Sequence, residues 1–551
     1  MSTKSRPFGG ASAAVATVVG KAFGLPAQRN RVLVTKGIQI PMRDGVLLVA
    51  DHYAPVSEHP RPTVLVRSAI GRANYFGLMY AQLYATRGYH VLLQSVRGTF
   101  GSGGEYVPVV NEAADGADTM TWLRGQDWFD GRLAMLGPST PGSPHWSFAL
   151  DPPPELKAMI VYVGGHDVAR AAYGRGPFAL QHFLNWSEMI ATQEHIGMVK
   201  AAMRLRDADK RITPTVNRLP LKGSADELLG AGPHLYDEWA TSPDPEAPCW
   251  NGMRLGDALD RLAAPTLLFG GWHDVASDQT LEQYERLRDR GVDVALTMGR
   301  WGHLDLSADF ALAARESLAW LDAHVDGAPG APRTAPLRIW ISGRDEWRDL
   351  PVWPPVTTSR TWYLHDGGRL ADNAPEGNTG TTAFRYDPQE PTPSVGGRVM
   401  SVNAGAVDNT ALEARKDVLT FTTEPLPRAV EFLGAPVVEL RISSDNPHAD
   451  LFARICDVDA KGRSVNVTDQ IIRLPQEAGV IRSIRLELAE IAHRFAEGHR
   501  IRLQVSGGAH PRYARNLGTA DPAGLGVESK PVNHDVHHNA AQVSRVSLPV
   551  A

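Results

Sequence analysis

A serine, an aspartate and a histidine stand at the ends of three separate strand-like runs in this 551-residue chain. Ser139 follows the apolar run 133–136 and lies two residues after Gly137, in the sequence Gly-Pro-Ser-Thr-Pro-Gly. A serine on a tight strand-to-helix turn can act as a nucleophile once a base removes its proton. The backbone N–H of the next residue, Thr140, can supply half of an oxyanion hole. The segment therefore predicts a nucleophile turn.

The acid and the base that such a serine needs follow it along the chain. The run 266–269 leads to Asp274, and the run 294–297 leads to His303. In this chemistry the histidine removes the serine proton and the carboxylate orients the histidine. Three such residues, in this order and each at a strand end, predict a catalytic triad of Ser139, Asp274 and His303.

Two other histidines compete with His303 for the role of base. His273 is next to the acid but precedes the last of the three strands, and His145 lies on the helix expected after Ser139. Both are ranked below His303, and His145 is expected to be structural. No group of His, Cys or Asp has the spacing of metal ligands, and the glycine-rich segments do not form a phosphate loop.

The pattern of apolar runs predicts the elements that position these residues. Over 31–167 and 256–328, short β-branched runs alternate with amphipathic stretches, which is typical of βαβ units and a mainly parallel sheet. Residues 168–255 have helical periodicity and many aromatic side chains, and predict a helical cap over the carboxyl edge of the sheet. These aromatics favour a largely apolar substrate group.

The chain changes character after a Gly/Ala/Pro linker at 327–332. Short alternating strands without helices predict a jelly-roll β-sandwich over 333–551, with its first strand at 337–342. Residues 1–30 form an N-terminal extension, for which a loosely attached helix is preferred to a signal peptide. The predicted fold class is thus an α/β core with an inserted helical cap, plus an all-β C-terminal domain.

Composition excludes several classes of function. The net charge of −5, with acids and bases mixed along the chain, provides no basic face for a nucleic acid. The two cysteines, Cys249 and Cys456, form neither a disulfide framework nor a metal cluster. No apolar run is long enough for a membrane span. We expect a cytoplasmic protein, with secretion as the alternative, and leave open whether it forms a homo-oligomer.

Several motifs resemble those of the cocaine-esterase / X-Pro dipeptidyl-peptidase (CocE/NonD) family of α/β-hydrolases, over nearly the whole chain. They are Pro-Met-Arg-Asp-Gly-Val at 41–46, the stretches 94–106, 118–123 and 128–132, Gly-Trp-His-Asp, Gly-Arg-Trp-Gly-His, and the segments 343–348 and 511–516. The resemblance implies an α/β-hydrolase core, a helical cap and a C-terminal jelly roll. It implies a serine hydrolase, and that mechanism requires neither a metal nor another cofactor.

The chain departs from the family pattern at two positions of the oxyanion hole. Thr140 stands where relatives have a tyrosine, which is tolerable because the backbone amide is the donor. Ile70 stands where the family has a tyrosine hydroxyl, and it can offer its backbone at most. Losing one donor typically costs on the order of 10²–10³ in rate, unless Asn74 or Tyr75 replaces it.

The preferred function is hydrolysis of a small-molecule carboxylic ester through an acyl-enzyme on Ser139, because an amide would demand more of a weakened oxyanion hole. Three alternatives stay open. An X-Pro-type dipeptidyl peptidase would need acids such as Asp167, Asp237 and Glu238 to hold the substrate amine. The other two are an acyltransferase with the same triad and a catalytically weakened homologue that binds a ligand or partner. The candidate substrate-binding side chains are Tyr75, Trp272 and Trp301.

Overall fold

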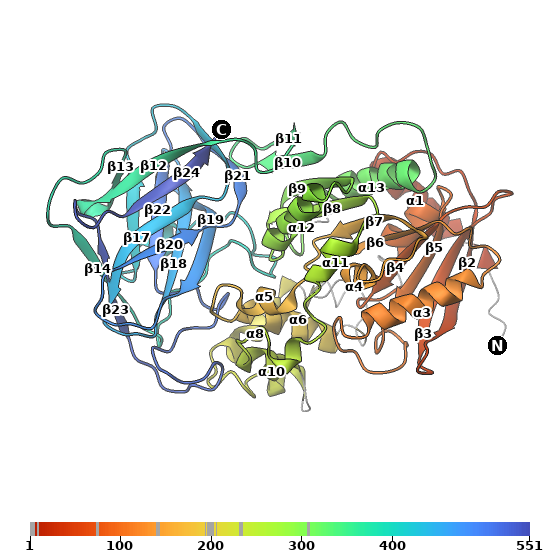
Figure 1. Ribbon diagram of the computed structural model, residues 1–551, viewed down its shortest axis with the longest axis horizontal. Helices are drawn as coiled ribbons and strands as arrows, with labels where there is room; N and C mark the ends of the chain where they lie inside the picture. The colour runs from red at the N-terminus through yellow and green to blue at the C-terminus, as the bar shows by residue number, and fades with distance from the viewer. Residues whose placement is uncertain are drawn as a thin grey trace.

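The computed structural model describes residues 6–7, 10–72, 77–138, 144–192, 194, 203–204, 206–230, 235–305 and 309–551. Two β-sheets organise these residues, one of 11 strands in the first part of the chain and one of 13 strands in the second. A group of helices lies between them in the sequence and along one side of both in space (Figure 1).

The first sheet has the order β1-β2-β3-β5-β4-β6-β7-β8-β9-β10-β11. The strands from β5 to β10 run parallel, whereas β1, β2, β3 and β11 pair antiparallel at the two edges. The bounds are β1 (Arg6–Pro7), β2 (Val32–Pro41), β3 (Leu47–Pro55), β4 (Thr63–Ser68), β5 (His90–Ser95), β6 (Leu133–Pro138), β7 (Leu156–Tyr162), β8 (Thr266–His273), β9 (Val294–Gly302), β10 (Leu337–Ile341) and β11 (Glu346–Leu350).

Both faces of this sheet are covered, as the continuous apolar runs of its central strands require. On β8, for example, Leu268 joins the apolar core on one face and Leu267 the core on the other, because successive side chains alternate. The first face is covered by α3 (Glu112–Arg124), α4 (Pro144–Phe148), α11 (Gly256–Arg261) and α12 (Ser277–Asp289). The second is covered by the π-helix η1 (Gly77–Gln82), α2 (Leu83–Ala85), α13 (Phe310–His324) and part of α1 (Gly10–Ala22).

The helix α1 is held more firmly than the sequence predicts. Its segment continues into Phe23, which packs against Phe310 with ring centroids 6.0 Å apart. Arg315 Nη1 donates to the Phe23 carbonyl at 2.6 Å, and Arg87 Nε donates to the Pro26 carbonyl at 2.9 Å. Among the residues that the structure describes, no helix is long and apolar enough to cross a membrane.

The segment between β7 and β8 is helical, as its periodicity predicts. Its described elements are α5 (Val168–Tyr173), α6 (Leu180–Thr192), α8 (Ala208–Val216), α9 (Asp226–Leu229), α10 (Leu235–Thr241) and the 3₁₀ turn η3 (Pro248–Trp250). Its aromatic side chains pack against one another: the Trp239 ring lies 4.8 Å from Trp186 and 5.3 Å from Phe183, centroid to centroid. They form the core of this helical segment, so their number says little about the polarity of a substrate.

The second sheet is built almost entirely from antiparallel neighbours, with a parallel pair between β13 and β15. The bounds are β12 (Thr358–His365), β13 (Arg369–Ala371), β14 (Thr381–Tyr386), β15 (Val418–Thr423), β16 (Val430–Gly434), β17 (Val437–Ser444), β18 (Asp450–Val458), β19 (Ser464–Arg473), β20 (Arg482–Glu487), β21 (Ile491–Phe495), β22 (Arg500–Ser506), β23 (Val532–His537) and β24 (Arg545–Val550). We call this part, 358–550, the β unit; it includes the short helices η5 (Asp366–Gly368) and α14 (Thr410–Glu413).

One predicted element belongs to the other sheet. The strand expected at 337–342 as the first of the jelly roll is β10, which pairs parallel to β9 with Leu337 opposite Leu296. β11 then returns antiparallel beside it, and Figure 1 shows both strands at the border of the two units. The change from one sheet to the other thus falls at 351–357, and a short alternating pattern fits either sheet equally well.

Candidate active site

The ends of β8 and β9 bring the predicted acid and base together. These strands are parallel neighbours, and His273 on β8 lies opposite Gly302 on β9. Asp274 directly follows the end of β8, and His303 directly follows the end of β9. Both residues therefore leave the same edge of the sheet side by side. His303 Nδ1 lies 2.7 Å from Asp274 Oδ1, and the side chains are 6% and 0% exposed. The ring's other nitrogen, Nε2, is left for a reacting group.

The Asp274 carboxylate is fixed from its own turn. The backbone N–H of Ala276 donates to Asp274 Oδ1 at 3.2 Å, and the Asp274 N–H donates to the Gly271 carbonyl at 3.0 Å. Asp274 Oδ2 is buried without a hydrogen-bond partner in the described part of the chain. A buried carboxylate held in this way fixes the orientation of the histidine ring and stabilises the imidazolium that forms during acyl transfer.

A glycine at position 271 allows the two catalytic loops to approach each other. A Cβ at Gly271 would lie 2.1 Å from the carbonyl oxygen of Trp301 and 2.5 Å from Cδ1 of its ring. No side chain fits at these distances, so any larger residue would push β8 and β9 apart. The glycines of the Gly-Trp-His-Asp and Gly-Arg-Trp-Gly-His motifs therefore have a packing role beside the acid and the base.

The predicted nucleophile Ser139 and the oxyanion residue Thr140 lie outside the described residues. The flanking elements are described: β6 ends at Pro138 and α4 begins at Pro144. β6 runs parallel to β7, which runs parallel to β8. The carboxyl end of β6 is consequently at the same edge of the sheet as Asp274 and His303.

The competing histidines belong to other environments. His273 faces the β unit: burial lowers its pKa to about 4, and Asp469 of the β unit opposes that shift. His145 is buried on α4 and hydrogen-bonds to the backbone of Leu136; burial also lowers its pKa to about 4. Neither has the carboxylate contact that His303 has.

The predicted oxyanion position at Ile70 is occupied by a local hydrogen bond. The Ile70 N–H donates to Ser68 Oγ, at the end of β4, with a distance of 3.1 Å. The isoleucine side chain has no hydrogen-bond donor. In this conformation, therefore, neither the side chain nor the backbone N–H of Ile70 is available to an oxyanion. The alternative donors, Asn74 and Tyr75, lie outside the described residues. The predicted substrate-binding role of Tyr75 therefore stays a prediction.

The geometry does not support the prediction that two tryptophans bind substrate. Trp272 is buried, donates from Nε1 to the Trp340 carbonyl at 2.8 Å and packs against Trp353. Trp301 is buried in the core on the other face of the sheet and packs against Trp347, with ring centroids 6.0 Å apart. Each lies two residues before a catalytic residue in sequence, but its side chain is buried in the protein interior.

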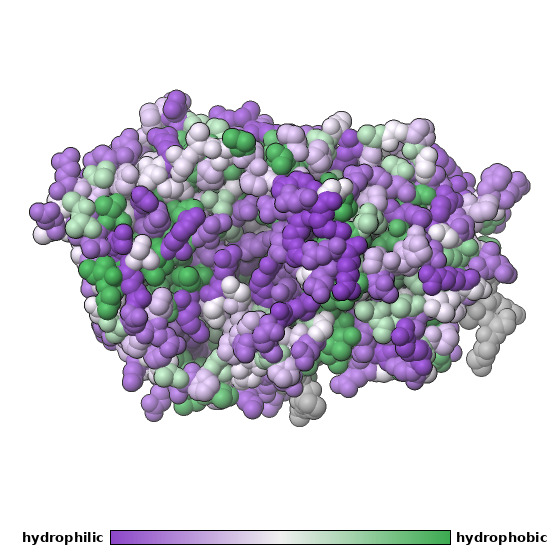
Figure 2. Space-filling model, viewed as in Figure 1, coloured by the Kyte–Doolittle hydropathy of each residue, from purple (hydrophilic) through white to green (hydrophobic). Residues whose placement is uncertain are grey.

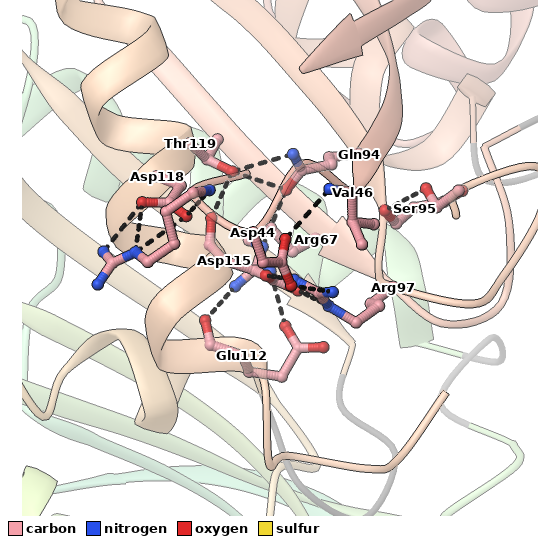
Figure 3. A network of polar contacts seen from close by, with 12 residues as sticks. Asp44, Val46, Arg67, Gln94, Ser95, Arg97, Glu112, Asp115, Asp118 and Thr119 are labelled. Atoms are coloured by element: carbon pink, nitrogen blue, oxygen red, sulfur yellow. Dashed lines mark hydrogen bonds and ion pairs between the residues drawn. The ribbon is translucent and has the colours of Figure 1, made fainter. Parts of the chain in front are cut away.

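A buried polar network supports the loop after β4 (Figure 3). Arg67, the residue before Ser68, is buried and pairs with Glu112 at the start of α3, Nη2 to Oε2 2.9 Å. Its Nε donates to Gln94 Oε1 on β5 at 2.9 Å, and Gln94 Nε2 donates to Thr119 Oγ1 at 3.0 Å. Burial raises the pKa of Glu112, while the Arg67 charge lowers it. One arginine thus ties two strands and a helix together beneath that loop.

The same network explains the motifs near the N-terminus. Arg97 bridges Asp115 on α3 (Nη2 to Oδ1 2.6 Å) and Asp44 (Nη1 to Oδ2 2.7 Å), as Figure 3 shows. Arg43 pairs with Asp118 one turn further along α3, Nη2 to Oδ1 2.9 Å. Apart from Asp115, these residues belong to the stretches 41–46, 94–106 and 118–123. Those stretches therefore have a structural role, because they hold the loops after β2 and β5 against α3.

The acids suggested for a substrate amine have other contacts. Asp167 caps α5, accepting the Arg170 N–H at 2.8 Å, and Asp237 accepts the Gly223 N–H at 2.9 Å. Glu238 is exposed on α10. The geometry therefore gives no support to these three residues as an amine-binding group.

Sequence reasoning missed two features beside the catalytic pair. His182 on α6 is buried near His303, and burial, with a smaller contribution from His303, lowers the pKa of His182 to about 3. The loop 397–405 of the β unit packs behind both catalytic loops: a Cβ at Gly302 would lie 2.8 Å from Cβ of Ala404. The sequence did offer a signal for His182, because it is a histidine among the aromatic residues of α6. No local sequence pattern marks the loop 397–405 as a neighbour of the catalytic residues.

The residues that the structure describes contain no group of three or more His, Cys, Asp or Glu able to hold a metal ion. The described side chains at this edge supply an acid–base pair beside the strand that leads to Ser139.

Comparisons with known proteins agree with this geometry. The sequence model of the X-Pro dipeptidyl-peptidase (S15 family) matches residues 44–305, and that of the X-Pro dipeptidyl-peptidase C-terminal non-catalytic domain matches 329–547. The cocaine esterase of Rhodococcus sp. (strain MB1 Bresler) is 30% identical, with 94% of this chain and 98% of the esterase covered.

Solved structures show the same fold along nearly the whole chain. An aminopeptidase from a marine sediment Thaumarchaeota archaeon has a TM-score of 0.79 at 21% identity, covering 94% of this chain and 96% of its own. An α-amino acid ester hydrolase has a TM-score of 0.79 at 23% identity, covering 96% and 98%. These likenesses confirm the predicted fold class, and the cocaine esterase match shows the family. The chain belongs to the cocaine esterase and X-Pro dipeptidyl-peptidase family of α/β-hydrolases and is a serine hydrolase.

Proposed function

We propose that this protein hydrolyses carboxylic esters of small molecules, with Ser139 as nucleophile, His303 as general base and Asp274 as the residue that orients the histidine. The observation that carries the proposal is the 2.7 Å contact between His303 Nδ1 and Asp274 Oδ1, at the sheet edge where β6 ends. The cocaine esterase of Rhodococcus, by its name an esterase, supports the same reaction class.

The first half of the reaction forms an acyl-enzyme. His303 Nε2 accepts the Ser139 hydroxyl proton while Oγ attacks the ester carbonyl carbon, giving a tetrahedral oxyanion. The Thr140 N–H stabilises that oxyanion, and Asp274 stabilises the imidazolium. His303 then returns its proton to the leaving alkoxide oxygen as the carbon–oxygen bond breaks, and the alcohol departs.

The second half regenerates the enzyme. His303 Nε2 takes a proton from water, and the oxygen attacks the acyl carbonyl. When the tetrahedral intermediate collapses, His303 protonates Ser139 Oγ and the carboxylic acid is released. The whole cycle passes through one acyl-enzyme, which is formed and broken down through tetrahedral intermediates.

An ester is preferred to an amide because of the loop after β4. The Ile70 side chain has no donor, and its N–H is engaged by Ser68 Oγ at 3.1 Å. A missing oxyanion donor typically costs on the order of 10²–10³ in rate, which an activated or ordinary ester tolerates better than an amide. The engagement of Asp167 and Asp237 in backbone hydrogen bonds also leaves a peptide amine without those two acids.

Hydrolysis of a p-nitrophenyl ester series, acetate to octanoate, tests the proposal. We expect wild type to turn over at least one ester, and Ser139→Ala to lose that activity while keeping its melting temperature. Ser147→Ala, which removes a buried hydroxyl on the following helix α4, is the matched control and keeps the activity. Equal rates for wild type and Ser139→Ala would refute the assignment of Ser139 as the nucleophile. Inactivity of wild type on every ester would refute the proposed esterase activity.

A further inference from the structure

A cavity of about 530 Å³ lies where three parts of the protein meet. Its walls come from α5 and α6 of the helical segment, from α12, and from the β unit. Figure 2 shows this face of the molecule hollowed beside the strongly hydrophilic surface around α12. Among the described residues that line the cavity, neither Asp274 nor His303 occurs.

The arginines that line this cavity already have carboxylate partners. Arg170 pairs with Glu282, and Arg398 pairs with Asp278, both on α12. Arg512 donates from Nη1 to Asp469 Oδ1 of the β unit at 2.7 Å. Arg175, which also lines the cavity, shares Asp278 with Arg398, Nη2 to Oδ2 3.6 Å. Each of the four arginines on the wall therefore already contacts a carboxylate of the protein.

One carboxylate on the wall has no cation of its own. In the described part of the chain, the hydrogen-bond partner of Glu490 is the indole Nε1–H of Trp353, a neutral donor. Glu487 and Asp278 line the same cavity. Burial, opposed by that hydrogen bond and reinforced by the nearby acids, raises the pKa of Glu490 to about 7. A largely desolvated carboxylate that lacks a cation is costly unless it takes up a proton or a bound positive charge neutralises it.

Unpaired polar groups on the part of the wall formed by α6 point to a ligand independently. His182 and Gln181, adjacent on α6, are 8% and 6% exposed, and His182 Nε2 and Gln181 Oε1 are without hydrogen-bond partners among the described residues. Both are able to accept a hydrogen bond. Buried polar groups are rarely left unpaired, and each is costly in isolation, so these two acceptors indicate a missing donor. Gln470 Nε2, on the β unit's wall of the same cavity, is a donor without a partner among the described residues.

We propose that this cavity binds a small organic cation with a primary ammonium group, which Glu490 neutralises and whose N–H groups donate to acceptors on α6. An ammonium has three donors and no acceptor, which matches a carboxylate, an amide oxygen and an imidazole nitrogen.

Calorimetric titration of the full chain with n-propylammonium chloride tests the site. We expect saturable binding to wild type and a dissociation constant on the order of tenfold higher in Glu490→Gln, the loss of roughly one charge-assisted contact. The exposed Glu497, also in the β unit, supplies the matched control, and Glu497→Gln should bind like wild type. Sodium propionate, of equal size but opposite charge, should give no saturable heat.

A second variant keeps the test independent of folding defects. Glu490→Asp retains the charge on a shorter side chain and should bind with intermediate affinity. Tetramethylammonium, which has no N–H, should bind wild type more weakly than propylammonium if the acceptors on α6 contribute. Unchanged affinity in Glu490→Gln, equal binding of propionate, or no saturable binding of propylammonium would overturn the proposal. Because no ester is present, the result is independent of the esterase assay.

Discussion

Trp301 fills the space that a side chain at Gly299 would need: a Cβ at position 299 would lie 2.0 Å from Cζ3 of the Trp301 ring. Both residues are on β9, two positions apart and therefore on the same side of the strand. The strand ends at Gly302, immediately before His303. The Trp301 ring thus packs over Gly299 on the same side of β9. This packing fixes the end of β9, which presents His303.

Gly299→Ala should therefore weaken both stability and catalysis. The added methyl group displaces the Trp301 ring, and overpacking of this kind costs about 1–3 kcal/mol in the free energy of unfolding. We expect a lower melting temperature and a lower kcat, because the shift reaches His303. Gly377→Ala is the control, since a Cβ there would meet only Thr379 O at 3.6 Å. Wild-type kcat in Gly299→Ala would contradict this role.

Asp274→Asn should separate orientation of the base from binding of the substrate. An asparagine keeps the shape but can present an N–H to His303 Nδ1, which favours the wrong tautomer of the ring. We expect kcat to fall on the order of 10³–10⁴ with little change in KM. Asp293→Asn, an exposed aspartate near His324, should leave kcat unchanged. A fall of less than tenfold in Asp274→Asn would show that another group orients the base.

Sequence alone was sufficient for the placement of Asp274 beside His303, because residues that follow neighbouring parallel strands leave the sheet at one edge. It failed where a side chain's direction mattered: Trp272 and Trp301 flank the catalytic pair in sequence, yet the alternation of the strands turns both into the interior. It also misplaced β10, since a short alternating strand does not reveal its partner. The contact of Ala404 with Gly302 joins residues about a hundred positions apart, and no local pattern encodes it.

The buried pair of Arg67 and Glu112 should be far more sensitive to truncation than a surface pair. Arg67→Met leaves the Glu112 carboxylate buried without its cation, and breaking one side of such a pair costs about 3–5 kcal/mol. Arg124→Met, which breaks the solvent-exposed pair with Glu155, should cost about 0–1 kcal/mol. Urea unfolding followed by circular dichroism measures both changes. Similar losses in the two variants would mean that the Arg67 network is not a buried support.

Glu490 should make the stability of wild type depend on pH. Its pKa is raised from 4.5 to about 7 in the folded state, so folding favours the protonated form. The stability that this group contributes is fully present below pH 4.5 and is lost as the pH rises through 7. Complete ionisation costs roughly 3 kcal/mol.

The measurement is the difference in free energy of unfolding between wild type and Glu490→Gln, taken from pH 4.5 to 8. The variant has no carboxyl to ionise, so this difference should shift in its favour as the pH rises. The charges that act on Glu490 are those of Glu285, Asp278 and Glu487, all acidic. A difference that stays constant across this range would contradict the raised pKa.

Asp209 on α8 fastens the helical segment to the loop of the β unit that packs behind the catalytic pair. Its Oδ1 accepts from Gln181 Nε2 on α6 at 2.8 Å, and its Oδ2 accepts from Ser401 Oγ at 2.5 Å and Asn403 Nδ2 at 2.9 Å. The loop 397–405 also places Ala404 against Gly302, the neighbour of His303. One carboxylate therefore couples the helices, the β unit and the base loop.

Asp209→Ala should loosen that coupling. Each hydrogen bond to a charged group is worth about 1.5–3 kcal/mol, so the variant should unfold at a clearly lower urea concentration. Because the loop supports Gly302, kcat should fall as well, and Asp209→Asn, which keeps one acceptor oxygen, should recover part of it. Asp207→Ala, at the start of the same helix with only exposed partners, is the control. If Asp209→Ala lowers stability but leaves kcat intact, the loop supports the fold without positioning the base.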